Sequence, residues 1–296
     1  VDEMIPAAKP FTGVVVGEVL TVEQHPDADR LRVTTVNIGT AETLQIVCGA
    51  PNVRVGMKAP VATIGAVLPG DFKIKKGKLR GIESQGMLCG ASEIDLEDKI
   101  DGLLELPSDA PVGINIREYL NLDDHVIDIS ITPNRGDCFS IRGIAREIAV
   151  INQLAVTEPV ITAVAATISD EKKVVVDTDG CPRYLGRVIK NVNTKAATPA
   201  WMEQALARSG IRQHSILVDI TNYVLIELGQ PLHAFDGGKV QGSVHVRQAT
   251  AAEKLVLLNE QEVELQDNVM VIADDEKALA MAGIMGGLSS SVTDET

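Results

Sequence analysis

The chain has 296 residues, of which 45% are hydrophobic and 23% are charged, a profile typical of a protein with a real hydrophobic core. At this length two or three domains are expected. The net charge of −14 argues against broad, non-specific binding of nucleic acid, because Lys and Arg supply most of the affinity for phosphate. No apolar run approaches the roughly 20 residues that cross a bilayer, and the N-terminus lacks the order of a signal peptide. We expect a cytoplasmic protein without a membrane partner, in which any contact with RNA is local.

Two features of the ends predict that the chain is a piece of a longer protein. It begins with Val1, and its last residues, 289 to 296, resemble the middle of a structure. The cysteines contain no CxxC pair and no histidine at zinc-ligand spacing, which predicts buried, reduced thiols and no metal site. They are Cys48, Cys89, Cys138 and Cys181.

From residue 11 to about 124 the chain consists of short apolar runs punctuated by Gly and Pro. Examples are GVVVGEV at 13 to 19, LRVTTVNIG at 31 to 39 and PVATIGAVLPG at 60 to 70. Turn signals recur at intervals of about 12 residues or fewer, a spacing typical of a small all-β sandwich or barrel. We predict such a unit here.

The pattern changes at Val126. Residues 126 to 131 alternate apolar and polar side chains as a half-buried strand does, and a Pro-Asn-Arg-Gly turn follows. Apolar residues then recur at helical spacing from Ile141 to Ile151, which predicts an amphipathic helix ending near Leu154. Residues 155 to 178 are expected to be a connector or edge strands.

A third unit is expected to start near Cys181. Thr198 followed by Pro199 predicts a helix with Thr198 as its N-cap, and Gly210 lies where a C-terminal cap belongs. Strand-like runs such as VHVRQA at 244 to 249 follow, so strands and helices are mixed in this unit. This mixture indicates an α+β or α/β unit.

One segment of the acidic chain is strongly basic. Between residues 73 and 80 five cations occur with no acid among them, and each could add to phosphate affinity. Phe72 is the only aromatic side chain close by, which weakens the case for sequence-specific recognition of a single strand. A solvated basic hairpin is the alternative. The cations are Lys73, Lys75, Lys76, Lys78 and Arg80.

Three motifs surround this segment in order: HPDADRL at 25 to 31, IVCGAPN at 46 to 52 and GIESQGML at 81 to 88. Together they resemble the tRNA-binding domain. This is an OB-fold barrel that occurs alone, at the end of some methionyl-tRNA synthetases, and inside the β subunits of bacterial phenylalanyl-tRNA synthetases.

The resemblance to those β subunits continues beyond the barrel, almost to the end of the chain. It is carried by the strand, ITPNRGDC turn and helix of 126 to 153, and by CPRYLGRVIKNV, VDITNYVLIELGQPLHAFD and ALAMAGIMGG, which start at residues 181, 218 and 278. It implies a multi-domain α+β fragment in which an OB-fold β-barrel is inserted in a small helical domain and is followed by an α/β editing domain. The implied boundaries are 1–10 for a linker from a truncated N-terminal domain, 11–124 for the tRNA-binding OB-fold domain, 125–165 for the second half of the small strand-helix domain, and 166–296 for the editing domain, truncated at its C-terminus.

The editing domain implied by the resemblance has a clear chemical purpose. A pocket shaped for phenylalanine rejects an isostere with one extra hydroxyl by only about a hundredfold, so tyrosine is misattached and must be hydrolysed from the tRNA. The family's pocket residues correspond to His233, Thr221 and Asn222 as catalytic residues and to Gly286 and Gly287 as substrate-binding residues.

Each of these signals is weak when taken alone. The glycines would leave room for an aromatic ring and expose backbone N–H groups, and His233 could position a water or the ester. A lone histidine in such a turn is, however, more often structural, and AGIMGG is more often a tight packing site. The family's tyrosine-sensing glutamate lies beyond Thr296, so the isolated chain is expected to edit poorly.

The resemblance also implies a role within a larger enzyme, phenylalanine-tRNA ligase. The synthetic active site would lie on the α subunit, and the partners would be that subunit and tRNA(Phe), in a heterotetramer of two α and two β subunits. ATP and Mg would serve the whole synthetase, and no cofactor is expected in this fragment. The chain contains no P-loop, no GxGxxG fingerprint and no ATP-binding motif of a class II synthetase.

Two rival interpretations remain open. In one, the chain is a non-catalytic RNA-binding and scaffolding subunit; in the other, the barrel recruits protein partners.

Overall fold

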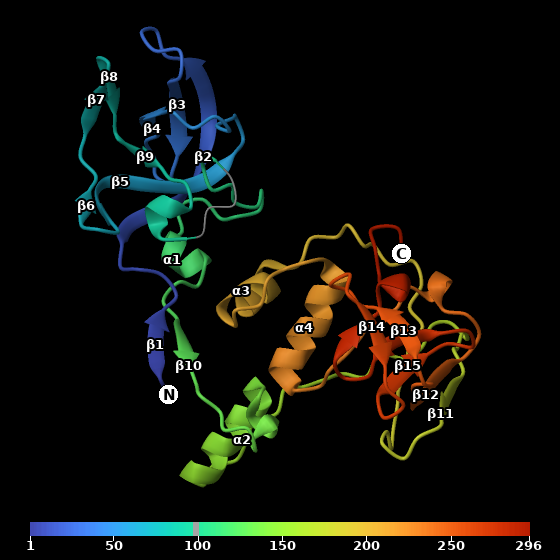
Figure 1. Ribbon diagram of the computed structural model, residues 1–296. Helices are drawn as coiled ribbons and strands as arrows, with labels where there is room; N and C mark the ends of the chain where they lie inside the picture. The colour runs from blue at the N-terminus through green and yellow to red at the C-terminus, as the bar shows by residue number, and fades with distance from the viewer. Residues whose placement is uncertain (97–100) are drawn as a thin grey trace. The chain divides into compact units, whose positions relative to one another are not determined.

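The computed structural model describes residues 1–96 and 101–296. They form two compact units, Val1–Ser130 and Ile131–Thr296 (Figure 1). The division between the units passes through the segment 125–165 that was expected to be half of one small domain. Among the described residues, no helix is long and apolar enough to cross a membrane.

A six-stranded antiparallel sheet dominates the first unit, where the apolar runs predicted strands. Its order is β4-β3-β2-β5-β6, and β9 pairs with β5 away from this path. Val14, Val16 and Val19 alternate on β2 and are fully buried, which is the pattern of a strand with one face on a core. The strands are β2 (Thr12–Gln24), β3 (Arg32–Asn37), β4 (Leu44–Cys48), β5 (Lys58–Leu68), β6 (Phe72–Lys73) and β9 (Gly86–Leu88).

The sheet curls until it nearly closes on itself. The long strand β2 pairs with β5 in its first half and with β3 in its second, and a register shift interrupts each pairing. On the far side, the Gln85 N–H donates to the Gln45 carbonyl at 2.8 Å, so the segment leading into β9 also touches β4. The result is a barrel-like sheet, as predicted for residues 11 to 124.

The first unit also contains two small pairs of strands (Figure 1). Strands β7 (Gly77–Leu79) and β8 (Ile82–Ser84) form a hairpin through a tight turn in which Arg80 and Gly81 have φ of 45° and 87°. Strand β1 (Glu3–Pro6) pairs with β10 (His125–Asp128). Part of the stretch expected to be a linker is thus an ordered strand.

Short helical elements close one end of this barrel. They are η1 (Ser92–Ile94) and α1 (Ile116–Tyr119), and the buried side chains of Ile94 and Ile116 pack with Phe11 in one apolar cluster. The Asn115 side chain accepts a hydrogen bond from the Arg117 N–H and caps α1.

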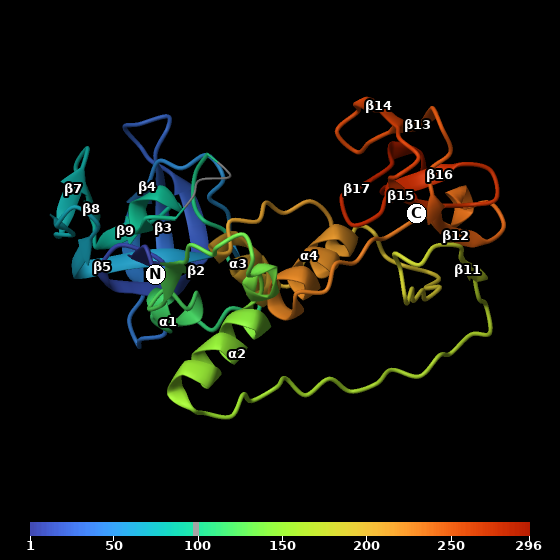
Figure 2. The same cartoon turned by 60° about the horizontal axis from the view of Figure 1, so that its bottom comes forward.

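The second unit starts with η2 (Gly136–Cys138) and the predicted amphipathic helix, α2 (Ile141–Asn152). The Ser140 hydroxyl accepts from the Gly143 N–H at 3.0 Å and caps α2, and Gln153 ends it in the left-handed region. A long stretch without regular structure then leads to the edge strand β11 (Val174–Val176), as Figure 2 shows. The expectation of a connector with an edge strand is confirmed.

Two further helices follow, α3 (Ala200–Arg208) and α4 (Ile216–Leu228). The prediction that Thr198 caps α3 is wrong, because Pro199 is the cap residue and the Thr198 hydroxyl donates to Asp219 instead. A buried carboxylate needs a donor more than a helix end near solvent does. Gly210 has φ of 72° just after α3, as predicted for a C-terminal glycine.

The strands of the second unit form a five-stranded sheet and a hairpin. The sheet has the order β11-β12-β15-β16-β17, with β11 and β12 parallel and the others antiparallel. Two buried apolar clusters lie on these strands, one containing Val246 and Leu279 and the other Leu255 and Val271. The elements are β12 (Val244–Gln248), β13 (Glu253–Val256), β14 (Glu262–Leu265), β15 (Met270–Ala273), β16 (Ala278–Met281) and β17 (Met285–Gly286), with η3 (Gly237–Lys239) and η4 (Leu288–Ser290).

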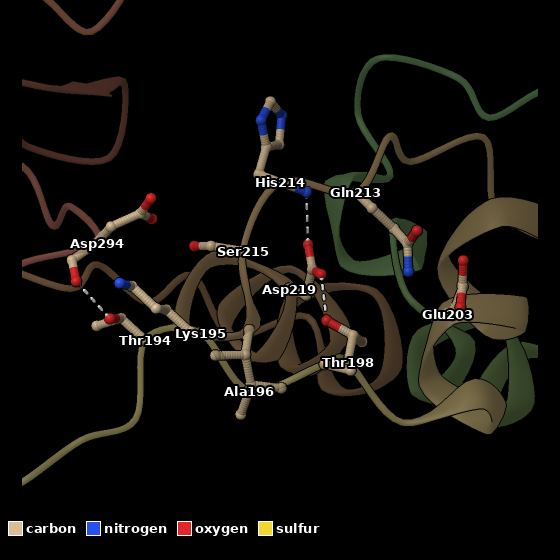
Figure 3. Close-up of a pocket in the computed structure, with 12 residues that line it drawn as sticks. Thr194, Lys195, Ala196, Thr198, Glu203, Gln213, His214, Ser215, Asp219 and Asp294 are labelled. Atoms are coloured by element: carbon tan, nitrogen blue, oxygen red, sulfur yellow. Dashed lines mark hydrogen bonds between the residues drawn. The ribbon is translucent and has the colours of Figure 1, made fainter. Parts of the chain in front are cut away.

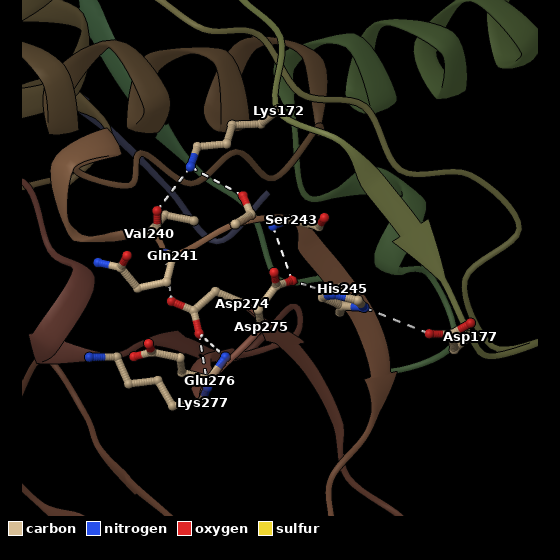
Figure 4. Close-up of polar contacts among 11 residues, drawn as sticks. Lys172, Asp177, Val240, Gln241, Ser243, His245, Asp274, Asp275, Glu276 and Lys277 are labelled. Atoms are coloured by element: carbon tan, nitrogen blue, oxygen red, sulfur yellow. Dashed lines mark hydrogen bonds and ion pairs between the residues drawn. The ribbon is translucent and has the colours of Figure 1, made fainter.

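Adjacent aspartates fasten the turn between β15 and β16 (Figure 4). The buried Asp274 carboxylate accepts from the N–H groups of Gln241, Glu276 and Lys277 at 2.8–2.9 Å. Burial opposes its ionisation, but these three hydrogen bonds outweigh burial and lower the pKa of Asp274. Asp275 accepts from His245 Nε2 at 2.8 Å, which joins the same turn to β12.

The prediction of buried, reduced thiols is confirmed for Cys48, Cys89 and Cys138 but not for Cys181. Three are buried free thiols and Cys181 is half-buried. Burial raises the pKa of Cys89 to about 12, so this thiol stays protonated and unreactive.

A salt bridge next to β13 gives a pH-dependent prediction. Arg247 donates two hydrogen bonds, of 2.8 and 2.9 Å, to the carboxylate of Glu253. These bonds lower the pKa of Glu253 from 4.5 to about 2. Because the pKa is lowered in the fold, the stabilisation is present above about pH 4.5 and is lost as the pH falls towards 2. We expect Glu253→Gln to lower the free energy of unfolding by roughly 1–3 kcal/mol at pH 7, with a smaller difference from the wild type at pH 3.

Urea unfolding followed by the fluorescence of Trp201, the sole tryptophan, measures this difference. The control is Glu262→Gln, which removes the pair with Lys254 and should cost much less, because solvent screens both exposed side chains. An equal loss in both variants, or a loss for Glu253→Gln that is the same at both pH values, contradicts the assignment.

Candidate functional site

The five cations of the basic segment are exposed and belong to β6, β7 and the turns beside them. Lys76 pairs with Glu83 across the hairpin at 2.7 Å. The other four cations are exposed as well, so their charged groups face solvent where an anion can reach them. The segment therefore has the exposure that phosphate contacts require.

A groove of about 690 Å³ connects this segment with two of the three sequence motifs. Residues 47–51 of the second motif form one wall, residues 72–75 of the basic segment with Gly77 and Leu79 form another, and residues 86–88 of the third motif also line it. Segments far apart in the sequence meet here because the sheet curls and nearly closes. Cations beside apolar surface are what a groove for single-stranded nucleic acid needs.

His25, from the first motif, ties that motif to the basic hairpin. It is buried, and its Nδ1 accepts the Asp27 N–H at 3.0 Å. That bond leaves the proton on Nε2, which lies 3.1 Å from the Leu79 carbonyl oxygen and donates to it. Sequence analysis used this motif as part of the resemblance to the tRNA-binding domain but did not predict the contact, which joins residues 54 positions apart.

Asn52, the last residue of the second motif, has a structural role. Its side chain donates to the Leu103 carbonyl and accepts from the Leu103 N–H, both at 2.9 Å. The side chain thus completes a two-bond pairing with a neighbouring segment and fixes the loop that carries residues 49 to 51.

We expect His25→Ala to loosen the basic hairpin without unfolding the barrel. Losing the Leu79 contact removes about 1 kcal/mol and also leaves a cavity, so amide hydrogen exchange in residues 77–84 should accelerate about fivefold or more. Mass-spectrometric exchange on the 296-residue chain measures it. The control is the exposed His125, whose change to Ala should leave this hairpin unchanged. Equal protection in the His25 variant would show that the histidine does not hold the hairpin.

In the second unit, His233 and Gly286 are in direct contact. Gly286 is buried in β17, and a Cβ atom added to it would lie 2.2 Å from His233 Cε1, so the imidazole rests on the bare backbone of the glycine. His233 also meets Phe235 edge-on, with ring centroids 4.5 Å apart. The ring is exposed on one side, yet the protein atoms crowding its other side lower its pKa below 6.5. At neutral pH the imidazole is uncharged and can accept a proton.

Gly287 is also required for packing, but its N–H is not free. That N–H donates to the Leu279 carbonyl at 2.7 Å, and an added Cβ would lie 2.5 Å from the same oxygen. The expectation that both glycines expose backbone N–H groups is therefore wrong for Gly287. The sheet uses this donor because a buried N–H without a partner is costly.

Thr221 and Asn222 lie on α4. The Thr221 hydroxyl donates to the Val218 carbonyl at 2.7 Å within the helix, and Asn222 is half-buried. Within the described ranges, no hydrogen bond joins either residue to His233 or to the two glycines. Their convergence with His233 in one pocket stays a prediction.

A cavity of about 360 Å³ lies beside the start of α4, lined by residues 194–198 and 213–216 among others (Figure 3). At its wall the almost fully buried Asp219 accepts from the Thr198 hydroxyl at 2.6 Å and from the His214 N–H at 3.0 Å. Asp219 precedes Thr221 by two residues, so these bonds fix the turn of α4 that carries Thr221. Sequence reasoning missed Asp219, although a carboxylate inside an apolar run is a signal of such an anchor.

One further polar cluster consists of Asp137, Cys138 and Glu147. The atoms that could ligate a metal, a carboxylate oxygen or Sγ from each residue, lie within 4.8 Å of one another. The Arg135 guanidinium lies among them and donates to all three side chains. Its hydrogen bonds lower the pKa of Asp137 and of Glu147. The arginine supplies the positive charge that these groups need, so the geometry is that of an ion-pair network.

Comparisons with known proteins match the two units of the chain to different families. Residues 14–115 match the family model of a tRNA binding domain, and residues 180–296 match that of the B3/4 domain. The chain thus combines a domain of the tRNA-binding family with a B3/4 domain.

Relatives that match this chain over its whole length identify its family. The chain is 79% identical to the phenylalanine-tRNA ligase beta subunit of Acinetobacter baylyi and 61% identical to that of Psychrobacter arcticus, in both cases over 100% of its own length. It belongs to the phenylalanine-tRNA ligase beta subunits, and it spans 37% and 38% of the lengths of these two relatives. Among solved structures, the C-terminal domain of Plasmodium vivax p43 is 25% identical with a TM-score of 0.26, over 41% of this chain and 62% of that one.

Proposed function

We propose that this chain is the part of a phenylalanine-tRNA ligase β subunit that binds tRNA through its first unit and removes misattached tyrosine from tRNA(Phe) through its second. The observation that carries the proposal is the groove in which the basic segment and two motifs meet, within residues matched by the tRNA binding domain. The relatives' shared name, a ligase beta subunit, supports an α subunit as partner. The proposal places the chain in a cytoplasmic heterotetramer, in which the α subunit uses ATP and Mg to attach phenylalanine.

The finer domain organisation is part of this proposal. Around the curled sheet the strands run β2, β3, β4, β9, β5, which supports a five-stranded OB barrel over residues 11–124. Strands β1 and β10 lie just before and just after the barrel in sequence and pair with each other. This pairing supports insertion of the barrel into a small domain that resumes at 125–165. Residues 166–296 are then the editing domain.

The position of the cations favours RNA as the ligand of the barrel. OB folds bind oligonucleotides on the face of their second and third strands and through the loops between strands 1 and 2 and between strands 4 and 5. In the proposed barrel these two loops are residues 25–31 and 69–85. The basic segment lies in the second loop, and His25 ties it to the first.

Neutralising the basic segment tests tRNA binding. We expect the triple change of Lys73, Lys75 and Lys78 to Gln to weaken binding of tRNA by about tenfold or more at 0.1 M salt, and to flatten its dependence on salt, because each lost phosphate contact removes about 0.7–0.9 from the log–log slope. Fluorescence anisotropy at several salt concentrations measures both quantities.

The matched control removes three exposed lysines of the second unit, Lys190, Lys254 and Lys277, and alters the net charge equally. If the two triple variants bind tRNA alike, the basic segment is not the RNA contact. Recruitment of a protein partner then becomes the better interpretation of the barrel.

The proposed editing reaction is hydrolysis of an ester. Water attacks the carbonyl carbon of tyrosyl-tRNA(Phe), the bond from that carbon to the ribose oxygen breaks, and the ribose oxygen takes up a proton. The uncharged His233 would position the water, with Thr221 and Asn222 holding the substrate. No covalent nucleophile is needed, so positioning supplies much of the rate. The contact of His233 with Gly286 supports this assignment.

Gly286→Ala is the sharpest test of the editing site. Its methyl group would have to occupy the space of the His233 ring, so we expect hydrolysis of tyrosyl-tRNA(Phe) by the assembled α/β enzyme to fall by about a hundredfold, as for His233→Ala, with phenylalanine attachment intact. Gly237→Ala is the control, because a Cβ there meets nothing within 4 Å. Unchanged hydrolysis in both variants would favour the non-catalytic, scaffolding alternative.

A further inference from the structure

We propose that the groove of the first unit contains a subsite for one unpaired RNA base, which stacks on Phe72 while Lys73 and Lys75 bind the adjoining phosphates. The inference rests on the proposed binding of tRNA by this unit and names the chemical group that the groove selects. That group is an unpaired base, so the ligand of the groove is a single-stranded segment of RNA.

Phe72 is presented to the groove and not to the core. Its side chain is 59% exposed although it lines the groove, and among the described lining residues it is the only aromatic one. Gly70 and Asp71 precede it with φ of 77° and 59°, which form the tight turn that starts β6, and the register pairs Phe72 with Leu68 of β5. The strand pairing fixes the backbone that carries the ring before any ligand arrives, so less of this segment must be ordered when a base stacks on it.

The groove continues the apolar surface around this ring. Leu79, 40% exposed, lines it from the hairpin, and the more buried side chains of Ile74 and Leu88 line it as well. A volume of about 690 Å³ is large enough for a nucleotide-sized molecule, since ligand pockets commonly measure about 300–1,000 Å³. A flat base fits such surroundings better than a phosphate does, because phosphate needs hydrogen-bond donors on every side.

Charge gives the bound strand an orientation. Lys73 and Lys75 follow Phe72 on one wall, whereas Glu93 lies at another, where its carboxylate comes within 2.8 Å of a Cβ added to Gly90. A carboxylate repels phosphate and accepts hydrogen bonds from exocyclic amines such as that of cytosine. The backbone therefore runs along the lysine wall, and the site favours bases with an amino group over uracil.

A protein ligand could also cover an exposed phenylalanine. The cations next to Phe72 favour an anionic chain with flat apolar groups, which describes single-stranded RNA and not an ordinary apolar peptide. We therefore expect the ring to discriminate between single-stranded and double-stranded RNA, since paired bases cannot reach it.

The experiment compares two RNAs with the 296-residue chain by fluorescence anisotropy: a cytosine-rich single strand of twelve nucleotides and the duplex formed with its complement. Stacking on an aromatic side chain is worth about 1–3 kcal/mol per base, so Phe72→Ala should weaken single-strand binding by roughly 5- to 140-fold and leave duplex binding unchanged. Phe72→Trp should restore single-strand affinity and show fluorescence quenching when RNA binds. The control is Ile64→Ala, which removes a similarly exposed apolar side chain of β5 outside the groove.

The outcomes separate this inference from the function on which it rests. If Phe72→Ala leaves single-strand affinity intact while the triple lysine variant loses it, the stacking subsite is overturned and RNA binding stands. If Phe72→Ala weakens the single strand and the duplex equally, stacking is again overturned. If neither variant changes RNA binding, both proposals for the first unit fail.

Discussion

The near-closure of the sheet in the first unit is the constraint on which its binding surface depends. Strand β9 has three residues, yet it pairs with β5, and the segment before it bonds to β4. The buried Ser84 hydroxyl reinforces the junction, accepting from the Val47 N–H at 3.1 Å and donating to the Gly86 carbonyl at 3.0 Å. Because the two edges meet here, the loop after β4 and the basic segment come to face one groove.

Electrostatics supports the proposed role of that groove. A chain with a net charge of −14 repels nucleic acid over most of its surface, so one cationic segment can attract RNA only at short range and in one place. The same logic governs the acids of the second unit. Asp219 and Asp274 are buried, but each accepts hydrogen bonds from backbone N–H groups or a hydroxyl, and each fastens a turn of the chain. In this protein buried carboxylates build the framework, and the exposed lysines of the basic segment are the proposed contacts of the ligand.

Close packing on glycine organises the second site. The imidazole of His233 lies where Gly286 has no side chain, and the Leu279 carbonyl lies equally close to Gly287. Neither glycine can be replaced without moving what rests on it. The tight packing that sequence reasoning considered as the plain alternative to a substrate pocket is thus present, and at Gly286 the group packed there is the proposed catalytic histidine.

Local patterns in the sequence determined the elements of this protein: the barrel strands, the helix α2, the glycine after α3 and the exposed basic hairpin each follow from periodicity, turn residues or charge within about a dozen positions. Family motifs indicated which residues to examine. Only the tertiary structure decided that His25 holds the hairpin, that Thr198 serves Asp219 and not a helix end, and that the Gly287 N–H belongs to the sheet. The physical reason is that a buried donor or acceptor takes whichever partner the packed chain brings near, and that partner can lie 54 residues away, where local periodicity carries no information.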